Sequence, residues 1–129
     1  RRGLENTSTP AELALLWEKL YRGQLLDAAH TQLALRLLAL HKADYLSAEL
    51  PEELDLRVAN KPGSLDGART DAGIIWAGRH EEQPFIVSAM VAYAHNGRAA
   101  EAAIARVAAA AYSCFERLAA SSQYGRRLP

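Results

Sequence analysis

Three short segments rich in β-branched and aromatic residues constrain the fold of this chain more than any other feature. They run over residues 55–61, 70–77 and 84–92. Because only short turns separate them, at residues 64–68 and 78–83, the simplest connection is an antiparallel meander. The last two segments carry apolar residues at both alternating sets of positions. This pattern predicts that both faces of the sheet are covered.

A helix is predicted before the strands, beginning at Thr9. Thr9 can cap a helix, Pro10 suits the first helical position, and Glu12 completes a capping box. The apolar stripe that follows ends at Gly23. The stripe has helical spacing and consists of Leu13, Leu16, Trp17, Leu20 and Tyr21.

A second helix is predicted from Asp27 to about Lys42. Its apolar face is broad, which predicts burial on two sides. The face consists of Leu33, Leu37 and Leu40, widened by Leu35 and Leu38. Residues 43–54 contain a proline and three glutamates with weak periodicity, a pattern typical of a surface connection.

A final, alanine-rich helix is predicted to begin near Asn96. Its small residues allow close approach to a sheet, and Cys114 on its apolar face is expected to be a buried, inert thiol. That face consists of Ile104, Val107, Ala111, Cys114 or Phe115, and Leu118. The expected fold class is therefore α+β: a helix pair, a three-stranded antiparallel sheet and a C-terminal helix packed on the sheet. Three strands are too few to leave both faces and both edges uncovered.

Composition excludes several functional classes. Fifteen basic and fifteen acidic residues give a net charge of zero, so no nucleic-acid partner is indicated. The four histidines are too scattered for a metal site, and we expect neither a metal nor another cofactor. The chain opens at Arg1 with no apolar run that could form a signal peptide or membrane span. This N-terminus is interpreted as lying inside a longer protein.

The segment Lys61-Pro62-Gly63-Ser64 ends the first predicted strand and precedes an Asp66-Gly67 turn. Together with the helix opening Asn6-Thr7-Ser8-Thr9-Pro10, it resembles the C-terminal half of the class A β-lactamase and penicillin-binding serine hydrolase family. In that family a T-x-T-P helix opening, a helix pair, the K-[TS]-G strand, two further strands and a C-terminal helix follow in this order. The resemblance spans roughly Asn6 to Phe115, and its specificity comes from the order and spacing of these parts.

The nucleophile motif of that family is absent from this chain. No serine is followed by a lysine three positions later, and no S-x-N triplet occurs. We therefore expect one incomplete domain, with a helical segment over residues 1–50 and strands plus the C-terminal helix over residues 51–129. The chain alone is predicted to be inactive, and its expected partner is the missing N-terminal half. The uncovered sheet surface also predicts aggregation or a homo-oligomer.

The resemblance implies roles for individual residues. Lys61 would be the catalytic cation that attracts an anionic substrate and assists proton transfer, while Gly63 would let the backbone approach the ligand. Ser64 would offer a backbone N–H to the oxyanion, and Arg69 a second cation to the substrate carboxylate. Asp71 is expected to be a structural hydrogen-bonding residue. The alternatives are a solvated charge for Lys61 and a surface ion pair for Arg69 and Asp71.

One departure from the family pattern concerns the substrate. Pro62 stands where the family usually has Thr or Ser, so a hydroxyl that would bind the substrate carboxylate is lost, although proline is tolerated on an edge strand. Three hypotheses follow: part of a serine hydrolase acting on a β-lactam or a related amide or ester, a non-catalytic binding module of the same fold, and a small structural domain. The resemblance implies a periplasmic or secreted location.

Overall fold

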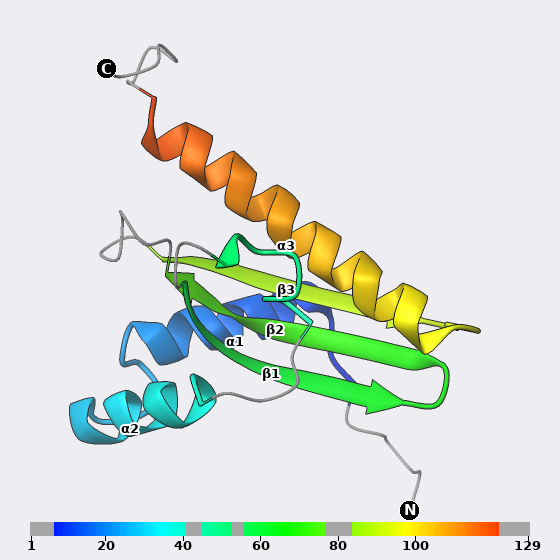
Figure 1. Ribbon diagram of the computed structural model, residues 1–129. Coiled ribbons are helices and arrows are strands. Elements are labelled where there is room, and N and C mark those ends of the chain that lie inside the picture. The colour runs from blue at the N-terminus through cyan, green and yellow to red at the C-terminus, as the bar shows by residue number, and fades with distance from the viewer. Residues whose placement is uncertain (1–6, 41–44, 53–55, 77–83, 122–129) are drawn as a thin grey trace, which may run out of the picture.

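In the computed structural model, which describes residues 7–40, 45–52, 56–76 and 84–121, an antiparallel sheet lies between two helical layers (Figure 1). Helices α1 and α2 cover one face of the sheet and α3 covers the other. The α+β prediction is confirmed. The elements in chain order are α1 (Pro10–Tyr21), α2 (Ala28–Leu38), β1 (Arg57–Leu65), β2 (Ala68–Trp76), β3 (Phe85–Ala92) and α3 (Gly97–Ala119).

Helix α1 begins and ends as its sequence predicts. The Thr9 hydroxyl accepts a hydrogen bond from the Glu12 N–H at 3.2 Å, and the Glu12 carboxylate accepts one from the Thr9 N–H at 2.8 Å. This reciprocal capping box satisfies two of the unpaired N–H groups at the helix start. At the other end Gly23 has φ +66°, a left-handed conformation that glycine adopts without strain.

The sheet is the predicted meander, with strand order β1-β2-β3 and both pairs antiparallel. Strand β1 runs through the Lys61-Pro62-Gly63-Ser64 motif to Leu65, further than predicted, and leaves only Asp66 and Gly67 in the turn. Proline is tolerated here because β1 is an edge strand of the described sheet. The predicted strand start at residue 55, the strand end at 77 and the turn at 78–83 lie outside the described residues.

Both faces of the sheet are covered by apolar packing, as the two-sided strands predict. Side chains alternate between the faces along each strand. Toward α3 they form a cluster that includes Ile75, Phe85, Val87, Ile104 and Ala108. Toward α1 and α2 they form a second cluster of Trp17, Leu35, Ala59, Ala72, Ile74 and Trp76. The two clusters show on which face of the sheet each site residue lies.

The leucine face of α2 is not buried on two sides, so that prediction is wrong. The helix turns Thr31 and Leu35 inward instead, because it meets the rest of the described fold along one narrow stripe only. The helix ends at Leu38, and the predicted end at Lys42 lies outside the described residues. The exposed side chains of the predicted face are Leu33 at 45%, Leu37 at 56% and Leu40 at 62%.

The segment before β1 is not a simple surface connection either. Leu46 and Leu50 are buried in the cluster on the α3 face of the sheet. Sequence periodicity is weak there because the described residues 45–52 contain no α-helix or strand, and two separate apolar side chains anchor them. Its backbone N–H groups also find a buried acceptor on β2, described below.

Helix α3 packs on the sheet through small side chains, but on a face rotated from the predicted one. Ala100, Ala105 and Ala108 let the helix axis approach the strands, with Ile104 and Tyr112 beside them. The C-terminal turns of α3 rise away from the sheet (Figure 1). Four residues of the predicted face are exposed, namely Val107, Cys114, Phe115 and Leu118, although the Phe115 ring still stacks on Phe85 of β3 with centroids 4.8 Å apart.

Candidate functional site

Lys61 lies on the outer strand of the described sheet, on the face covered by α1 and α2. Ala59, two residues earlier, and Ala72, its partner on β2, both belong to the cluster on that face. The Lys61 side chain is exposed, and its Nζ donates a hydrogen bond to the Pro62 carbonyl at 2.9 Å. The Lys61 ammonium therefore stands at the sheet edge beside the backbone of its own motif, with no acidic partner among the described residues.

Gly63 lies on the same face as Lys61 and is opposite Thr70 on β2. A Cβ on Gly63 would lie 2.5 Å from the Thr70 hydroxyl, so any larger residue would require that hydroxyl to move. Thr70 thus places a hydroxyl beside the motif, and it is not among the site residues predicted from the sequence. The signal was available: with Asp66 and Gly67 as the turn, antiparallel pairing brings residue 63 opposite residue 70.

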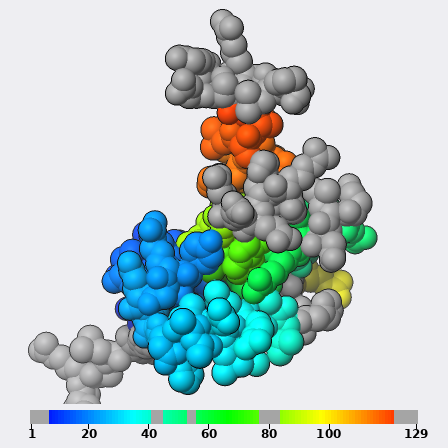
Figure 2. All heavy atoms as spheres, turned by 90° about the vertical axis from the view of Figure 1, so that its left-hand side faces the viewer, coloured from blue at the N-terminus to red at the C-terminus, as the bar shows by residue number. Residues whose placement is uncertain are grey.

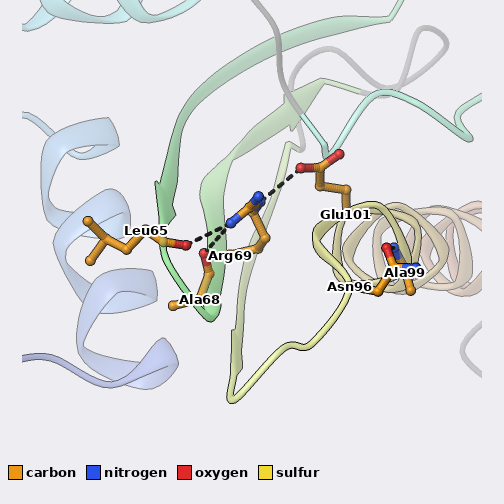
Figure 3. A network of polar contacts seen from close by, with 6 residues as sticks. All are labelled: Leu65, Ala68, Arg69, Asn96, Ala99 and Glu101. Carbon is orange, nitrogen blue, oxygen red and sulfur yellow. Dashed lines mark hydrogen bonds and ion pairs between the residues drawn. The ribbon is translucent and has the colours of Figure 1, made fainter.

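Ser64 and Arg69 face each other across β1 and β2, on the α3 side of the sheet. Arg69 Nε lies 2.8 Å from Glu101 Oε1 on α3, and Nη1 donates to the Leu65 and Ala68 carbonyls at 2.8 and 2.9 Å (Figure 3). The hydrogen bond with Glu101 raises the pKa of Arg69 above its usual value. Arg69 therefore points away from the Lys61 face and ties the hairpin turn to the start of α3.

The contacts around this turn form a small, connected structure. The Ala94 N–H donates to the Gly67 carbonyl at 2.8 Å, and the Asn96 side chain caps α3 by accepting from the Ala99 N–H at 3.1 Å. Gly97 packs against the Arg69 guanidinium, where a Cβ would collide. A hollow of about 510 Å³ lies between them. Its lining consists of Ser64, Leu65, Asp66, Gly67, Arg69, Ala94, His95 and Gly97.

Asp71 is fully buried on β2 and is the structural hydrogen-bonding residue that the sequence predicts. Its Oδ2 accepts from the Tyr45 and Leu46 N–H groups at 3.0 and 3.2 Å. The Asn60 amide donates to both carboxylate oxygens, at 3.1 and 2.9 Å. A buried carboxylate needs such donors to offset the loss of water. The surface ion pair considered for Asp71 is therefore wrong, whereas Arg69 does form one with Glu101.

The network of Asp71 bears directly on the motif, because Asn60 immediately precedes Lys61. The hydrogen bonds to Asp71 hold the Asn60 side chain on the α3 side of the sheet. Because successive side chains of a strand point to opposite faces, the Lys61 side chain then lies on the other face. The residues that position Lys61 are thus on β2 and in the segment before β1.

Among the residues that the structure describes, no three His, Cys, Asp or Glu side chains come together as a metal site. Within the same residues, no helix is long and apolar enough to cross a membrane.

Known proteins resemble this chain in sequence family and in fold. The model of the β-lactamase enzyme family matches residues 1–115. The solved structure of PBP-A has a TM-score of 0.78 and 25% identity, over 87% of this chain and 41% of that chain. A variant of PBP-A was solved as an acyl-enzyme complex with penicillin G. No match was found among curated proteins.

Two further solved structures are similar. A variant of the last common ancestor of Gram-negative bacteria class A β-lactamase has a TM-score of 0.78 and 27% identity, over 90% of this chain and 44% of that chain. The β-lactamase from Sphaerobacter thermophilus shares the fold, with a TM-score of 0.76 and 23% identity, over 90% of this chain and 44% of that chain.

The sheet and its helical layers form part of a fold of the class A β-lactamase and penicillin-binding type. Since the family model matches nearly the whole chain, the chain belongs to the β-lactamase enzyme family. The chain spans less than half the length of these solved relatives, between 41 and 44%.

Proposed function

We propose that this chain supplies the substrate-anchoring strand of a serine hydrolase that acts through an acyl-enzyme on a β-lactam or a related amide or ester. The observation that carries the proposal is the edge strand β1, on which Lys61 and Gly63 share one face and the Lys61 ammonium has no acidic partner in the described part of the chain. Membership of the β-lactamase enzyme family gives this arrangement a precedent.

Each residue of the motif has a role in the proposal. Lys61 attracts the substrate carboxylate and assists proton transfer to or from the nucleophile. Gly63 keeps the strand bare of a side chain, so that a ligand can approach the backbone. The Ser64 N–H is one donor of an oxyanion hole, where a preorganised N–H stabilises the negative charge that develops in the transition state.

A direct contact between Arg69 and substrate stays a prediction. The side chain lies on the other face of the sheet from Lys61 and is engaged by Glu101 and two carbonyl groups. This geometry supports an indirect role, in which Arg69 holds the β1–β2 turn and with it the end of the motif strand.

Pro62 bears on the choice of substrate. It has no hydroxyl for a substrate carboxylate, which argues against efficient β-lactam turnover and favours another amide or ester. Thr70 offers a hydroxyl beside Gly63 on the Lys61 face, and we propose that it takes over part of this contact. Pro62 is also the observation that favours the second candidate function, a non-catalytic binding module of the same family.

The nucleophile has to come from outside this chain, because no S-x-x-K motif occurs in it. We propose that the N-terminal half of the same fold supplies it, and that this half completes the one incomplete domain formed by residues 1–50 and 51–129. The outer edges of β1 and β3 and the exposed leucines of α2 are surfaces on which it could pack. The alternative is that two copies of this chain pair through the same surfaces. The family resemblance also leads us to expect export to the periplasm or outside the cell.

Acylation tests the proposal. A penicillin is added to the undigested protein, and intact-mass spectrometry shows whether a species containing this chain gains the penicillin mass. We expect acylation of a larger or associated species, slowed about 100-fold or more by Lys61→Ala. Lys19→Ala, which removes an exposed lysine on α1, is the matched control and should leave the rate unchanged.

Two results would contradict the proposal. If no species that contains this chain takes up the label with penicillin or with simple ester and amide substrates, the binding-module reading replaces it. Equal acylation rates in the two lysine variants would remove Lys61 from the site.

A further inference from the structure

A second hollow lies at the end of the sheet opposite the hairpin turn. It measures about 340 Å³ and is lined by Tyr21, Gln32, Leu35, Arg36, Arg57 and Trp76. Figure 2 faces this end of the molecule, where green strand residues reach the surface between blue α1 and cyan α2. The size lies within the range of small-molecule sites. Arg57 stands four residues before Lys61 on β1, so this hollow is separate from the proposed hydrolase site.

The charge of the hollow is one-sided. Arg36 and Arg57 both line it, and among the described residues no carboxylate lines it and neither arginine forms an ion pair. By contrast, Arg22 pairs with Glu18 and Arg69 with Glu101. Two guanidinium groups that share one concave surface repel each other and favour an anion between them.

Arg57 is held ready for such an anion. Its guanidinium carbon lies 4.4 Å from the centroid of the Trp76 ring, a cation–π contact that restrains the group without using its hydrogen-bond donors. The fork of N–H groups matches the geometry of a carboxylate, and a restrained fork loses less entropy on binding.

The rest of the lining is apolar and aromatic. Trp76 and Leu35 are buried and form a fixed floor, and Tyr21 contacts the Trp76 ring edge-on, with centroids 6.4 Å apart. Tyr21 itself is exposed and leaves one ring face available. An anionic head group would therefore meet the arginines while a ring packs against Tyr21 and Leu35.

We propose that this hollow binds a small aromatic carboxylate. The carboxylate bridges the guanidinium groups of Arg36 and Arg57, and the ring packs against Tyr21 and Leu35. The inference rests on these contacts alone and does not depend on the proposed hydrolase function.

The test is a titration of the full chain with benzoate, followed by the indole N–H resonances of Trp76 and Trp17 in NMR spectra. We expect saturable shifts of the Trp76 resonance below about 10 mM benzoate. Benzamide, a neutral molecule of nearly the same shape, and acetate, a carboxylate without a ring, should each bind at least about tenfold more weakly. Arg36→Gln and Arg57→Gln should each weaken benzoate binding by about tenfold or more.

Controls separate this site from other effects. Arg57→Lys keeps a cation over the ring but loses the planar fork, and we expect it to weaken binding severalfold. Arg98→Gln, which removes an exposed arginine on α3, should leave benzoate binding unchanged. Dispersed amide spectra of every variant show that the fold is kept. Absence of saturation, equal binding of benzamide or acetate, or arginine variants that bind like the parent would each overturn the proposal.

Discussion

Asp71 offers the sharpest test of how this fold is held together. Asp71→Ala removes the acceptor of at least three N–H groups, namely the Tyr45 and Leu46 backbone N–H groups and the Asn60 side-chain amide. A buried donor left unpaired costs about 1–3 kcal/mol. Tyr45 is only partly buried, and removing a buried charge returns some desolvation energy, so we expect a total loss of about 3–5 kcal/mol in the free energy of unfolding.

This loss is large for a small domain, whose free energy of unfolding is about 5–15 kcal/mol. Urea denaturation followed by tryptophan fluorescence measures it. Asp71→Asn keeps the volume and one acceptor oxygen, and should cost about 2–3 kcal/mol. Glu49→Ala removes an exposed carboxylate from the same segment and should change stability by less than about 0.5 kcal/mol.

Hydrogen exchange of the Leu46 amide gives an independent measurement. Protection of this amide should fall sharply in Asp71→Ala, since its acceptor is gone. The reasoning is refuted if Asp71→Ala costs no more than Glu49→Ala, or if the Leu46 amide stays as protected as in the parent chain.

Two further predictions concern single residues. Gly73→Ala places a Cβ 2.6 Å from the Asn60 Cβ, so β1 and β2 must separate, at a cost of about 3 kcal/mol in the free energy of unfolding. Gly67 lies in open space but has φ +69°, so Gly67→Ala should cost only about 1 kcal/mol. Urea denaturation measures both costs, and equal values would contradict this reasoning. The Thr9 backbone hydrogen bond lowers the Glu12 pKa from 4.5. The resulting stability is fully present above pH 4.5 and is lost as the pH falls through the lower folded pKa, so Glu12→Gln should flatten the acid side of the stability profile, and an unchanged slope would exclude this effect.

The site itself shows how far sequence reasoning reaches. Side chains on a strand alternate with a period of two, so Lys61 and Gly63 had to share a face. The two-residue turn then sets the register: Lys61 is opposite Ala72, and Arg69 is opposite Ser64. Arg69 therefore lies on the other face from Lys61, although the resemblance placed both cations at the substrate. The predicted turn over residues 64–68 was too long to fix this parity.

The sequence by itself determined where α1 and α3 begin and where the β1–β2 hairpin turns. Thr9, Asn96 and the Asp66-Gly67 turn act within a few residues of the chain, so local chemistry is enough to decide their conformation. The order of these elements around the Lys61 motif was likewise enough to indicate the family.

Only the tertiary structure decided which side chains are buried. The pairs of Asp71 with Leu46 and Arg69 with Glu101 join residues 25 and 32 positions apart. The exposed leucines of α2 and the exposed Cys114 of α3 lie on helix stripes whose pattern fits burial equally well. An amphipathic pattern shows that a face can be buried, but the approach of distant segments, set by packing and by pairing of buried polar groups, decides which faces are buried.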